Sequence, residues 1–172
     1  SSDPEMNWQI TELANRSILS FSDAHSPAKM GREATIFDLE EATYEQVRQA
    51  IMRKGKSRIL YTIEFYPEEG KYHFSGHRNC KVVFGPEEIA EKGNICPICK
   101  KRLTEGVLYR LQQLSQKNAS VVVEQKMSPN GIKWYTNTTK NHPPFVKLVP
   151  LLEIVAQALE SSVSSQKSKA VF

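Results

Sequence analysis

The sequence is poor in cysteine and histidine, with three and four residues of these types in 172. A small and odd number of thiols excludes a disulfide-rich secreted scaffold. No stretch approaches the roughly 20 consecutive apolar residues that a membrane-spanning helix needs. The first residues also lack the basic-then-apolar order of a secretory signal peptide, which suggests a processed or truncated chain as much as a cytosolic one, and we expect a cytoplasmic location. The chain starts without Met and stops on apolar residues, and we expect it to be a fragment of a longer one.

Acidic residues are scarce in the later part of the chain. Residues 1–47 hold nine acids and three Lys or Arg, a balance of −6, whereas residues 48–172 hold ten acids and twenty Lys or Arg, a balance of +10. An acidic part followed by a basic part suits a metal-binding piece joined to one that meets a polyanion. Ordinary solvated surface charge is the alternative.

An Asp and a His two positions apart follow a short apolar run. Residues 17–21 are expected to form a strand, and Asp23 and His25 come directly after it, before Pro27. Side chains two apart on a strand point to the same face, so this pair could hold one metal ion or one substrate. A hydrogen-bonded structural His is the competing interpretation. This spacing supplies only part of a metal site.

The spacing of apolar residues predicts a βα unit around this pair. A short helix is expected over residues 6–15, a further extended piece at 35–37, and an amphipathic helix over 44–52 with Thr43 as its N-cap. In parallel α/β folds, sites lie at the carboxyl ends of strands, which is where Asp23 and His25 would lie.

The later elements have a different character. Residues 58–66 predict a strand, with a turn at 67–70 and a returning hairpin strand at 71–74. Helices are expected over about 103–116 and 149–159. Turns at 129–131 and 142–144 flank an extended piece at 132–135, and 161–168 is typical of a linker.

All three cysteines gather in one local cluster. Cys96 and Cys99 form a C-x-x-C pair, and His77 and Cys80 form an H-x-x-C pair fifteen residues upstream. Two such pairs, with a short β-ribbon between them, are typical of a tetrahedral structural zinc site. A disulfide or a thioredoxin-like motif is disfavoured by the odd thiol count and by the absence of a βαβ setting. His73 is the rival fourth ligand, but the paired spacing favours His77.

Two basic stretches predict a nucleic-acid surface. Residues 48–58 hold five Lys or Arg and no acid, and residues 125–152 hold Lys126, Lys133, Lys140 and Lys147, also without an acid. Trp134, Tyr135 and Phe145 lie among them. Cations neutralise phosphates and flat rings stack on bases. A solvated strand face with Trp134 in the core is the alternative.

Three motifs in order carry a resemblance to a known family. They are Asp23-Ala24-His25 followed by Gly31-Arg32-Glu33-Ala34, the run from Thr62 to His73, and the His77/Cys80 and Cys96/Cys99 pairs. Together they resemble endonuclease Q, a branch of the polymerase-and-histidinol-phosphatase (PHP) phosphoesterases. The resemblance covers about residues 6–115 and is weaker over 144–156.

The resemblance implies a DNA repair endonuclease that cuts 5′ of a deaminated base such as uracil or hypoxanthine. Asp23 and His25 would be the last ligands of a catalytic divalent metal site (Zn²⁺, Mn²⁺ or Mg²⁺) in a distorted β/α barrel. The zinc module and the C-terminal part would grip deaminated DNA. The resemblance leaves open whether a sliding clamp or another repair protein is a partner. Relatives are also described as helicase-like, but no G-x-x-x-x-G-K-[ST] phosphate loop occurs here.

We therefore expect an α/β fragment, the last βα unit of that barrel, over residues 1–57. A zinc-ribbon β-hairpin module with a following helix would span 58–116, and a basic α+β region 117–172. The expected site residues are Asp23 and His25 for catalysis, and His77, Cys80, Cys96 and Cys99 for structural zinc. The fragment alone is expected to be inactive. The alternative function is a non-catalytic zinc-ribbon DNA-binding module, such as one from a helicase-associated protein.

Overall fold

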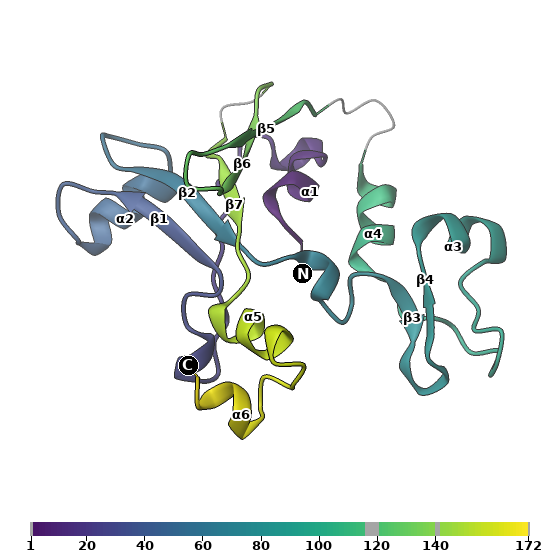
Figure 1. Cartoon of the computed structure of the whole chain (residues 1–172). Coiled ribbons are helices and arrows are strands. Elements are labelled where there is room, and N and C mark those ends of the chain that lie inside the picture. Colours follow the sequence, from purple (N-terminus) through teal and green to yellow (C-terminus); the bar gives the residue numbers. More distant parts are fainter. Residues whose placement is uncertain (1, 116–120, 140–141, 172) are drawn as a thin grey trace.

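A computed structural model describes residues 2–115, 121–139 and 142–171. Its centre is a mixed five-stranded sheet in the order β1-β2-β7-β6-β5 (Figure 1). The strands are β1 (Ala34–Asp38), β2 (Arg58–Glu64), β5 (Val123–Met127), β6 (Lys133–Asn137) and β7 (Phe145–Lys147). β2 pairs with β7 in parallel, and the other neighbours are antiparallel. The expected mixed α/β character is confirmed.

Short helices cover the sheet. α1 (Pro4–Trp8) packs against β6, and α2 (Tyr44–Ile51) packs against β1 and β2. Thr43 caps α2 as expected, because its side chain accepts from the amide of Gln46. The sheet contains strands from all three segments expected along the chain, so these segments share one structural unit.

An aromatic core joins α1 to the sheet. Trp8 is 2% exposed and meets the ring of Phe145 edge to face, with 5.4 Å between centroids. Phe145 is fully buried and stacks on Tyr135 of β6 at 4.7 Å. Because large rings bury much apolar area, this cluster accounts for a large share of the sheet's stability.

A small module lies to one side of the sheet (Figure 1). It contains the hairpin β3 (Ser75–His77) and β4 (Val82–Phe84), followed by α3 (Pro86–Lys92). α4 (Val107–Leu114) contacts both β3 and α3. The module's own core is a cluster around Ile89, Cys96 and Leu103.

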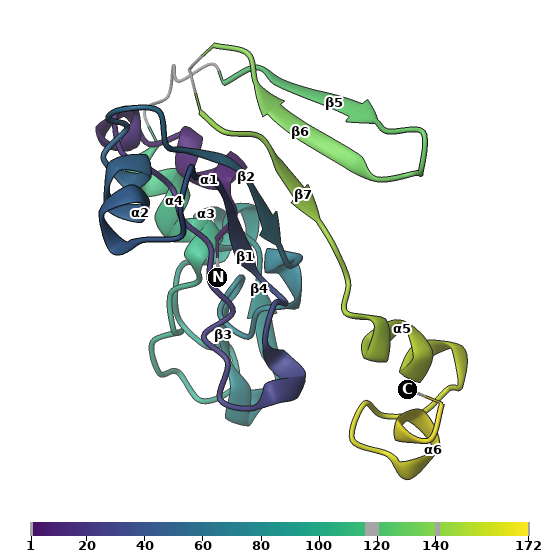
Figure 2. The same cartoon turned by 90° about the vertical axis from the view of Figure 1, so that its left-hand side faces the viewer.

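The C-terminal helices α5 (Leu151–Ala158) and α6 (Gln166–Lys169) project from the end of β7 (Figure 2). The stretch expected to be a linker instead folds against α5. Ser168 is fully buried, and its hydroxyl lies 2.6 Å from that of Ser161. Within the described residues, no helix combines the length and the apolar character needed to cross a bilayer.

Two expected strands are wrong. Residues 17–24 form no strand, because the backbone of Ser20 bonds the Thr35 side chain on both its N–H (2.9 Å) and its C=O (3.0 Å) instead of a neighbouring backbone. Residues 71–74 do not return beside β2, because β1 and β7 already occupy its two edges. The hairpin starts later, at Ser75. The barrel stays a prediction.

The helix boundaries also differ from those expected. The N-terminal helix is α1 followed by a separate 3₁₀ turn, η1 (Thr11–Leu13). Tyr72 and His73 accept from the amides of Val107 and Leu108, so α4 begins after this attachment instead of at residue 103. Its expected end at Gln116 lies outside the described residues.

Candidate metal centre

The first ligand pair lies where the β3–β4 hairpin turns. His77 ends β3, and a 3₁₀ turn, η4 (Arg78–Cys80), follows it. Lys81 then adopts a left-handed conformation with φ of 54°, and its amide donates to the carbonyl of Arg78 at 2.9 Å. This tight turn brings Cys80 back toward His77.

Gly76 allows the two strands of this hairpin to approach closely. A Cβ on Gly76 would lie 2.5 Å from the backbone oxygen of Val82. Any other residue would force the strands apart. The hairpin that presents His77 therefore requires glycine here.

The second ligand pair has the same construction. The amide of Cys96 donates to the carbonyl of Lys101 at 2.8 Å, and the amide of Lys100 donates to the carbonyl of Cys96 at 3.0 Å. Lys100 is left-handed, with φ of 61°, as Lys81 is after the first pair. An isolated bridge between Ile95 and Arg102 closes the loop. Each pair is thus folded by a turn that ends on a left-handed lysine.

The two pairs converge on one point. The ligand atoms of His77, Cys80, Cys96 and Cys99 all lie within 4.8 Å of one another. The Nδ1 of His77 lies 3.2 Å from the Sγ of Cys99. A tetrahedral zinc ion with sulfur at about 2.3 Å separates its ligands by roughly 3.8 Å. The group therefore has the composition and the size for one such ion.

Local electrostatics favour a thiolate at Cys96. Burial opposes its ionisation, but the amides of Cys99 and Ile98 and the ring of His77 lower the pKa of Cys96 to about 6. Burial raises the pKa of Cys80 to about 11, and its contacts with Cys99 and Cys96 act in the same direction. Metals bind the thiolate, so a cation at the centre would replace the proton that Cys80 otherwise keeps.

His73 does not join this group. Its side chain is 4% exposed and lies edge-on to the ring of Phe74, with 4.6 Å between centroids. Burial lowers its pKa. His77 is thus the histidine that meets the three cysteines, as the paired spacing indicated.

The connection between the two pairs differs from the expected β-ribbon. Between Cys80 and Cys96 the chain forms β4 and then α3. Pro86 starts α3, and the side chain of Glu88 accepts from the amide of Gly85 at 3.0 Å, which favours a helix at this point. Ile89 of this helix packs beside the thiols.

Asp23 and His25 lie apart from this centre, in an exposed loop before the 3₁₀ turn η2 (Pro27–Lys29). Asp23 is left-handed, with φ of 45°. The Nδ1 of His25 lies 2.8 Å from the carbonyl oxygen of Asp23. A carbonyl can only accept, so Nδ1 carries a proton, and in the neutral ring Nε2 then keeps its lone pair. Among the described residues, neither side chain belongs to a group of three or more candidate ligands.

The basic stretches are largely neutralised. Arg48, Lys56 and Arg58 form ion pairs with Glu45, Glu40 and Asp38, in that order. Lys126 pairs with Glu124. Glu45 and Glu124 lie on the same elements as their partners, α2 and β5, whereas Asp38 ends β1 and Glu40 follows it. Lys140 lies outside the described residues.

The aromatic residues among these cations are mostly internal. Phe145 and Tyr135 belong to the core, and half-buried Trp134 packs edge-on to Tyr61 at 5.0 Å. The alternative interpretation, a solvated strand face with Trp134 in the core, is met only in part, because Trp134 is half-buried while Tyr135 and Phe145 form the core.

Two buried sites with ionisable side chains were not predicted from the sequence. Lys147 donates to the Oδ2 of Asp3 at 2.7 Å, and the two side chains are 11% and 3% exposed. Glu64, 2% exposed, accepts from the hydroxyls of Ser20 and Thr62, both at 2.5 Å. Burial raises the pKa of Glu64 to about 7, although both hydroxyls oppose the shift. The available signal for Glu64 was an acid directly after Ile63 in a strand rich in apolar residues.

Comparison with protein-family models finds no match. The chain is 29% identical over 170 residues to an uncharacterized protein of Methanocaldococcus jannaschii, covering 95% of this chain and 19% of that protein. It is 30% identical over 116 residues to the uncharacterized protein YqxK of Bacillus subtilis, covering 67% of this chain and 29% of the relative.

Two solved structures match nearly the whole chain. One is a crystal structure of the lesion-specific endonuclease PfuEndoQ from Pyrococcus furiosus, with 28% identity and a TM-score of 0.73. The other is endonuclease Q in complex with a 27-mer duplex that has an abasic lesion at the active site, with 27% identity and a TM-score of 0.77. Each match covers 99% of this chain and 39% of the solved one. The chain is endonuclease Q-like in sequence and fold, and spans about two fifths of those proteins.

Proposed function

We propose that this chain is the zinc-stabilised, DNA-engaging part of a DNA repair endonuclease that hydrolyses a phosphodiester 5′ of a deaminated base. The likeness to endonuclease Q over 99% of the chain is the observation that carries the proposal. A crystallised endonuclease Q holds a duplex with an abasic lesion at its active site, and we propose that this chain contributes to the same DNA contact. Uracil and hypoxanthine are the proposed lesions, turned out of the base stack.

In this proposal, zinc at His77, Cys80, Cys96 and Cys99 is structural. Four protein ligands complete a tetrahedral shell and leave no position for water or substrate, which distinguishes structural zinc sites from catalytic ones. The ion would fix the β3–β4 hairpin against the Cys96–Cys99 loop. It would thereby hold the cations beside both ligand pairs at set positions.

Asp23 and His25 are the proposed ligands of a catalytic divalent ion. The Nδ1–H of His25 bonds the carbonyl of Asp23, which fixes the tautomer and turns the Nε2 lone pair outward, the arrangement that metal-bound histidines use. A bound ion would supply an activated water for attack on phosphorus. Two side chains do not complete such a site, and we propose that further polypeptide supplies the other ligands.

A non-catalytic zinc-ribbon module that binds DNA is the second candidate. It is favoured by the exposed position of Asp23 and His25 and by the presence, among the described residues, of one ligand cluster, the His77 group. In this case the 5′ cut would belong entirely to another part of the protein.

Metal content and nicking separate the two candidates. About one zinc per chain, lost on Cys96→Ser substitution, is expected in both cases. Nicking of uracil- or hypoxanthine-containing duplexes is then measured with a longer polypeptide that contains this chain and has the full length of the solved endonuclease Q proteins. Asp23→Ala and His25→Ala should each abolish nicking if these residues bind the catalytic ion, whereas Glu41→Ala, which removes an exposed acid elsewhere, should not.

Undiminished nicking by both variants would remove Asp23 and His25 from the catalytic site and favour the non-catalytic module. A protein without zinc would contradict the structural role of the cysteines. A flat response of DNA affinity to salt would contradict DNA contact by this chain, because phosphate contacts release counterions.

A further inference from the structure

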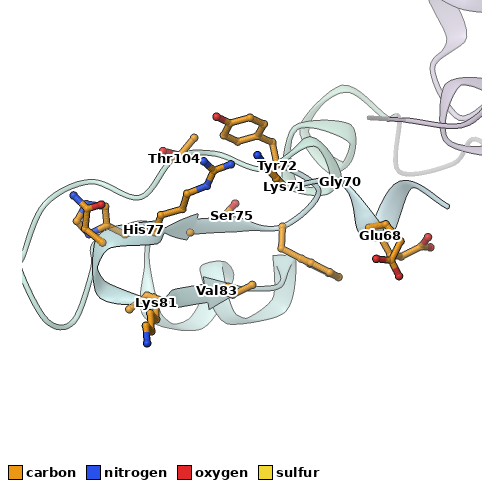
Figure 3. A pocket seen from close by; sticks show the side chains of 15 residues that line it. Glu68, Gly70, Lys71, Tyr72, Ser75, His77, Lys81, Val83 and Thr104 are labelled. Carbon is orange, nitrogen blue, oxygen red and sulfur yellow. The ribbon is translucent and has the colours of Figure 1, made fainter. Parts of the chain in front are cut away.

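A hollow of about 620 Å³ opens beside the metal ligands (Figure 3). It lies between the segment that follows β2 and the β3–β4 hairpin. Figure 3 shows Glu68 at one end of the hollow, with His77 and Lys81 at the other and Tyr72 between them. A hollow of this size is in the range of small-ligand sites.

The wall combines exposed aromatic rings with cations. Tyr72 is 56% exposed and Phe74 39%, both high values for large rings. The guanidinium of Arg78 lies 5.0 Å from the centroid of Tyr72. Lys71, Arg78 and Lys81 are all exposed. The rings on the strands of the five-stranded sheet are buried or half-buried, whereas at this hollow exposed rings lie beside exposed cations.

The cations of the hollow are also unneutralised. Within the described part of the chain, Lys71, Arg78 and Lys81 form no ion pair. The basic residues Lys56 and Arg58, beside the sheet, are paired with acids. Unpaired cations leave a positive potential that attracts an anion.

The backbone beneath these groups is held from two sides. The carbonyls of Tyr72 and His73 accept from the amides of Val107 and Leu108 at 2.8 and 3.1 Å, where α4 begins. Arg78 and Lys81 flank the ligand Cys80 in the sequence. A ligand would therefore meet a surface that is already formed, which lowers the entropy cost of binding.

We propose that this hollow binds one unstacked nucleotide of a DNA strand. The base stacks on Tyr72, and the flanking phosphate contacts Arg78 and Lys81. Glu68 and Glu69 line the opposite end and repel a second phosphate there, which limits the site to a single nucleotide. This assignment rests on the proposed function for its choice of DNA, and adds to it the residues that hold the base.

The test measures binding of two labelled strands by fluorescence anisotropy. One is an oligothymidylate of about ten nucleotides, and the other has the same length but carries abasic sites in place of bases. The unmodified chain should prefer the thymidylate by about 5- to 150-fold, the effect of stacking one base. Tyr72→Ala should remove this preference, and Tyr72→Phe should keep it. Tyr44→Ala is the matched control, because Tyr44 is exposed on α2, away from the hollow.

The phosphate contacts are tested by salt dependence. Arg78→Gln combined with Lys81→Asn should reduce the slope of log affinity against log salt by about 0.7, which corresponds to the loss of one neutralised phosphate on a single strand. Asn is chosen because it tolerates the left-handed backbone at Lys81. Unchanged zinc content in every variant shows that the module is still folded.

A base preference retained by Tyr72→Ala, in a variant that still holds zinc, would overturn the assignment of the hollow while leaving DNA binding by the chain intact. An unchanged salt slope in the double variant would likewise overturn the phosphate contacts. If the unmodified zinc-loaded chain binds neither strand, both the hollow and the DNA-engaging function are refuted.

Discussion

The five-stranded sheet and the small module that contains the His77, Cys80, Cys96 and Cys99 cluster have different cores. The sheet buries large aromatic side chains of α1, β6 and β7 around Trp8 and Phe145. The module's buried cluster contains Ile89, Cys96 and Leu103, with no ring fully inside it. So small a core is rarely enough to hold a fold by itself. Aromatic burial therefore stabilises the sheet, whereas we propose that metal ligation completes the small core of the module.

The two regions also treat charge differently. The sheet encloses charged groups, Asp3 with Lys147 and the carboxyl of Glu64. The module instead keeps its cations at the surface, beside the metal ligands and around the hollow. Buried charges specify how strands and segments fit together, whereas exposed ones are available to a partner. Breaking each region separately should therefore have different consequences.

Removal of the metal should have the largest effect, and should be confined to the module. Structural zinc contributes about 10–16 kcal/mol in isolated zinc-finger peptides, because folding and binding occur together. A chelator, or Cys96→Ser, should abolish hydrogen-exchange protection of β3, β4 and α3. The amides of β2 and β7 should keep theirs. The measurement is hydrogen exchange followed by peptide mass spectrometry.

Re-addition of zinc is the control for chelation, and should restore protection in the unsubstituted chain but not in Cys96→Ser. Protection of the module that survives without metal would mean that its small core suffices. Simultaneous loss in the sheet would show that the two regions are not stabilised independently.

Breaking the Asp3–Lys147 pair should affect the sheet and leave the metal site unchanged. Asp3 also accepts from the amide of Met6 at 2.9 Å, so one carboxylate caps α1 and joins it to β7. Lys147→Met leaves the Asp3 charge buried without its partner, which costs about 3–5 kcal/mol of unfolding free energy. Denaturant unfolding followed by tryptophan fluorescence measures the loss, since Trp8 belongs to the affected core.

Lys126→Met is the matched control for this prediction. It breaks the exposed pair with Glu124, which should cost no more than about 1 kcal/mol. Equal losses in the two lysine variants would mean that burial of the Asp3–Lys147 pair adds nothing. Addition of Asp3→Asn to Lys147→Met should recover part of the loss, because no buried charge then lacks a partner.

The contrast between the two regions also explains which features were predictable from sequence. Ligand spacing is local, and the His77, Cys80, Cys96 and Cys99 pairs could be identified because each turn is formed within a few residues. Thr43 and α2 were predictable for the same reason. The partners of β2 were not, because β7 is contributed by a segment about eighty residues later. The expected strand over residues 17–21 does not form, because the backbone N–H and C=O of Ser20 bond the side chain of Thr35 and not the backbone of a neighbouring strand.

The ion pairs of the basic stretches could not be predicted for a related reason. Residues 48–58 contain no acid, yet Glu40 and Asp38 reach Lys56 and Arg58 from the preceding turn and strand. Pairing between strands brings the acidic and basic parts of the chain together, and charge counts along the sequence cannot show this. The same limit applies to Asp3 and Lys147, which lie at opposite ends of the sequence.

Glu64 should give the sheet a pH response that the module lacks. Its folded-state pKa of about 7, against the usual 4.5, means that the folded state holds this proton more tightly than the unfolded state. The contribution to stability is therefore fully present below about pH 4.5, declines as the pH rises toward 7, and is level above that. The decline is at most about 3 kcal/mol. Glu64→Gln should remove it, as measured by hydrogen exchange of β2 amides across this range.

Region-resolved exchange is needed for this prediction because acid also releases zinc by protonating the thiolates, which destabilises the module in the opposite direction. Glu41→Gln, at an exposed acid, is the control and should leave the response of β2 unchanged. If Glu64→Gln keeps the full pH dependence of β2, its carboxyl is charged in the folded sheet and another group titrates.

The smallest expected effect is at the cap of α2, where neither aromatic burial nor metal ligation contributes. The side chain of Thr43 accepts from the amide of Gln46 at 3.4 Å, a long bond at an exposed helix end. Thr43→Ala should cost about 1 kcal/mol at most, and Thr43→Asp should restore the cap and favour the helix dipole. The measurement is exchange of the first-turn amides of α2. Because α2 packs against β1 and β2, a loss that spread through the sheet would show that this helix is part of its cooperative unit, whereas a loss confined to the first turn would show that α2 frays independently of the sheet.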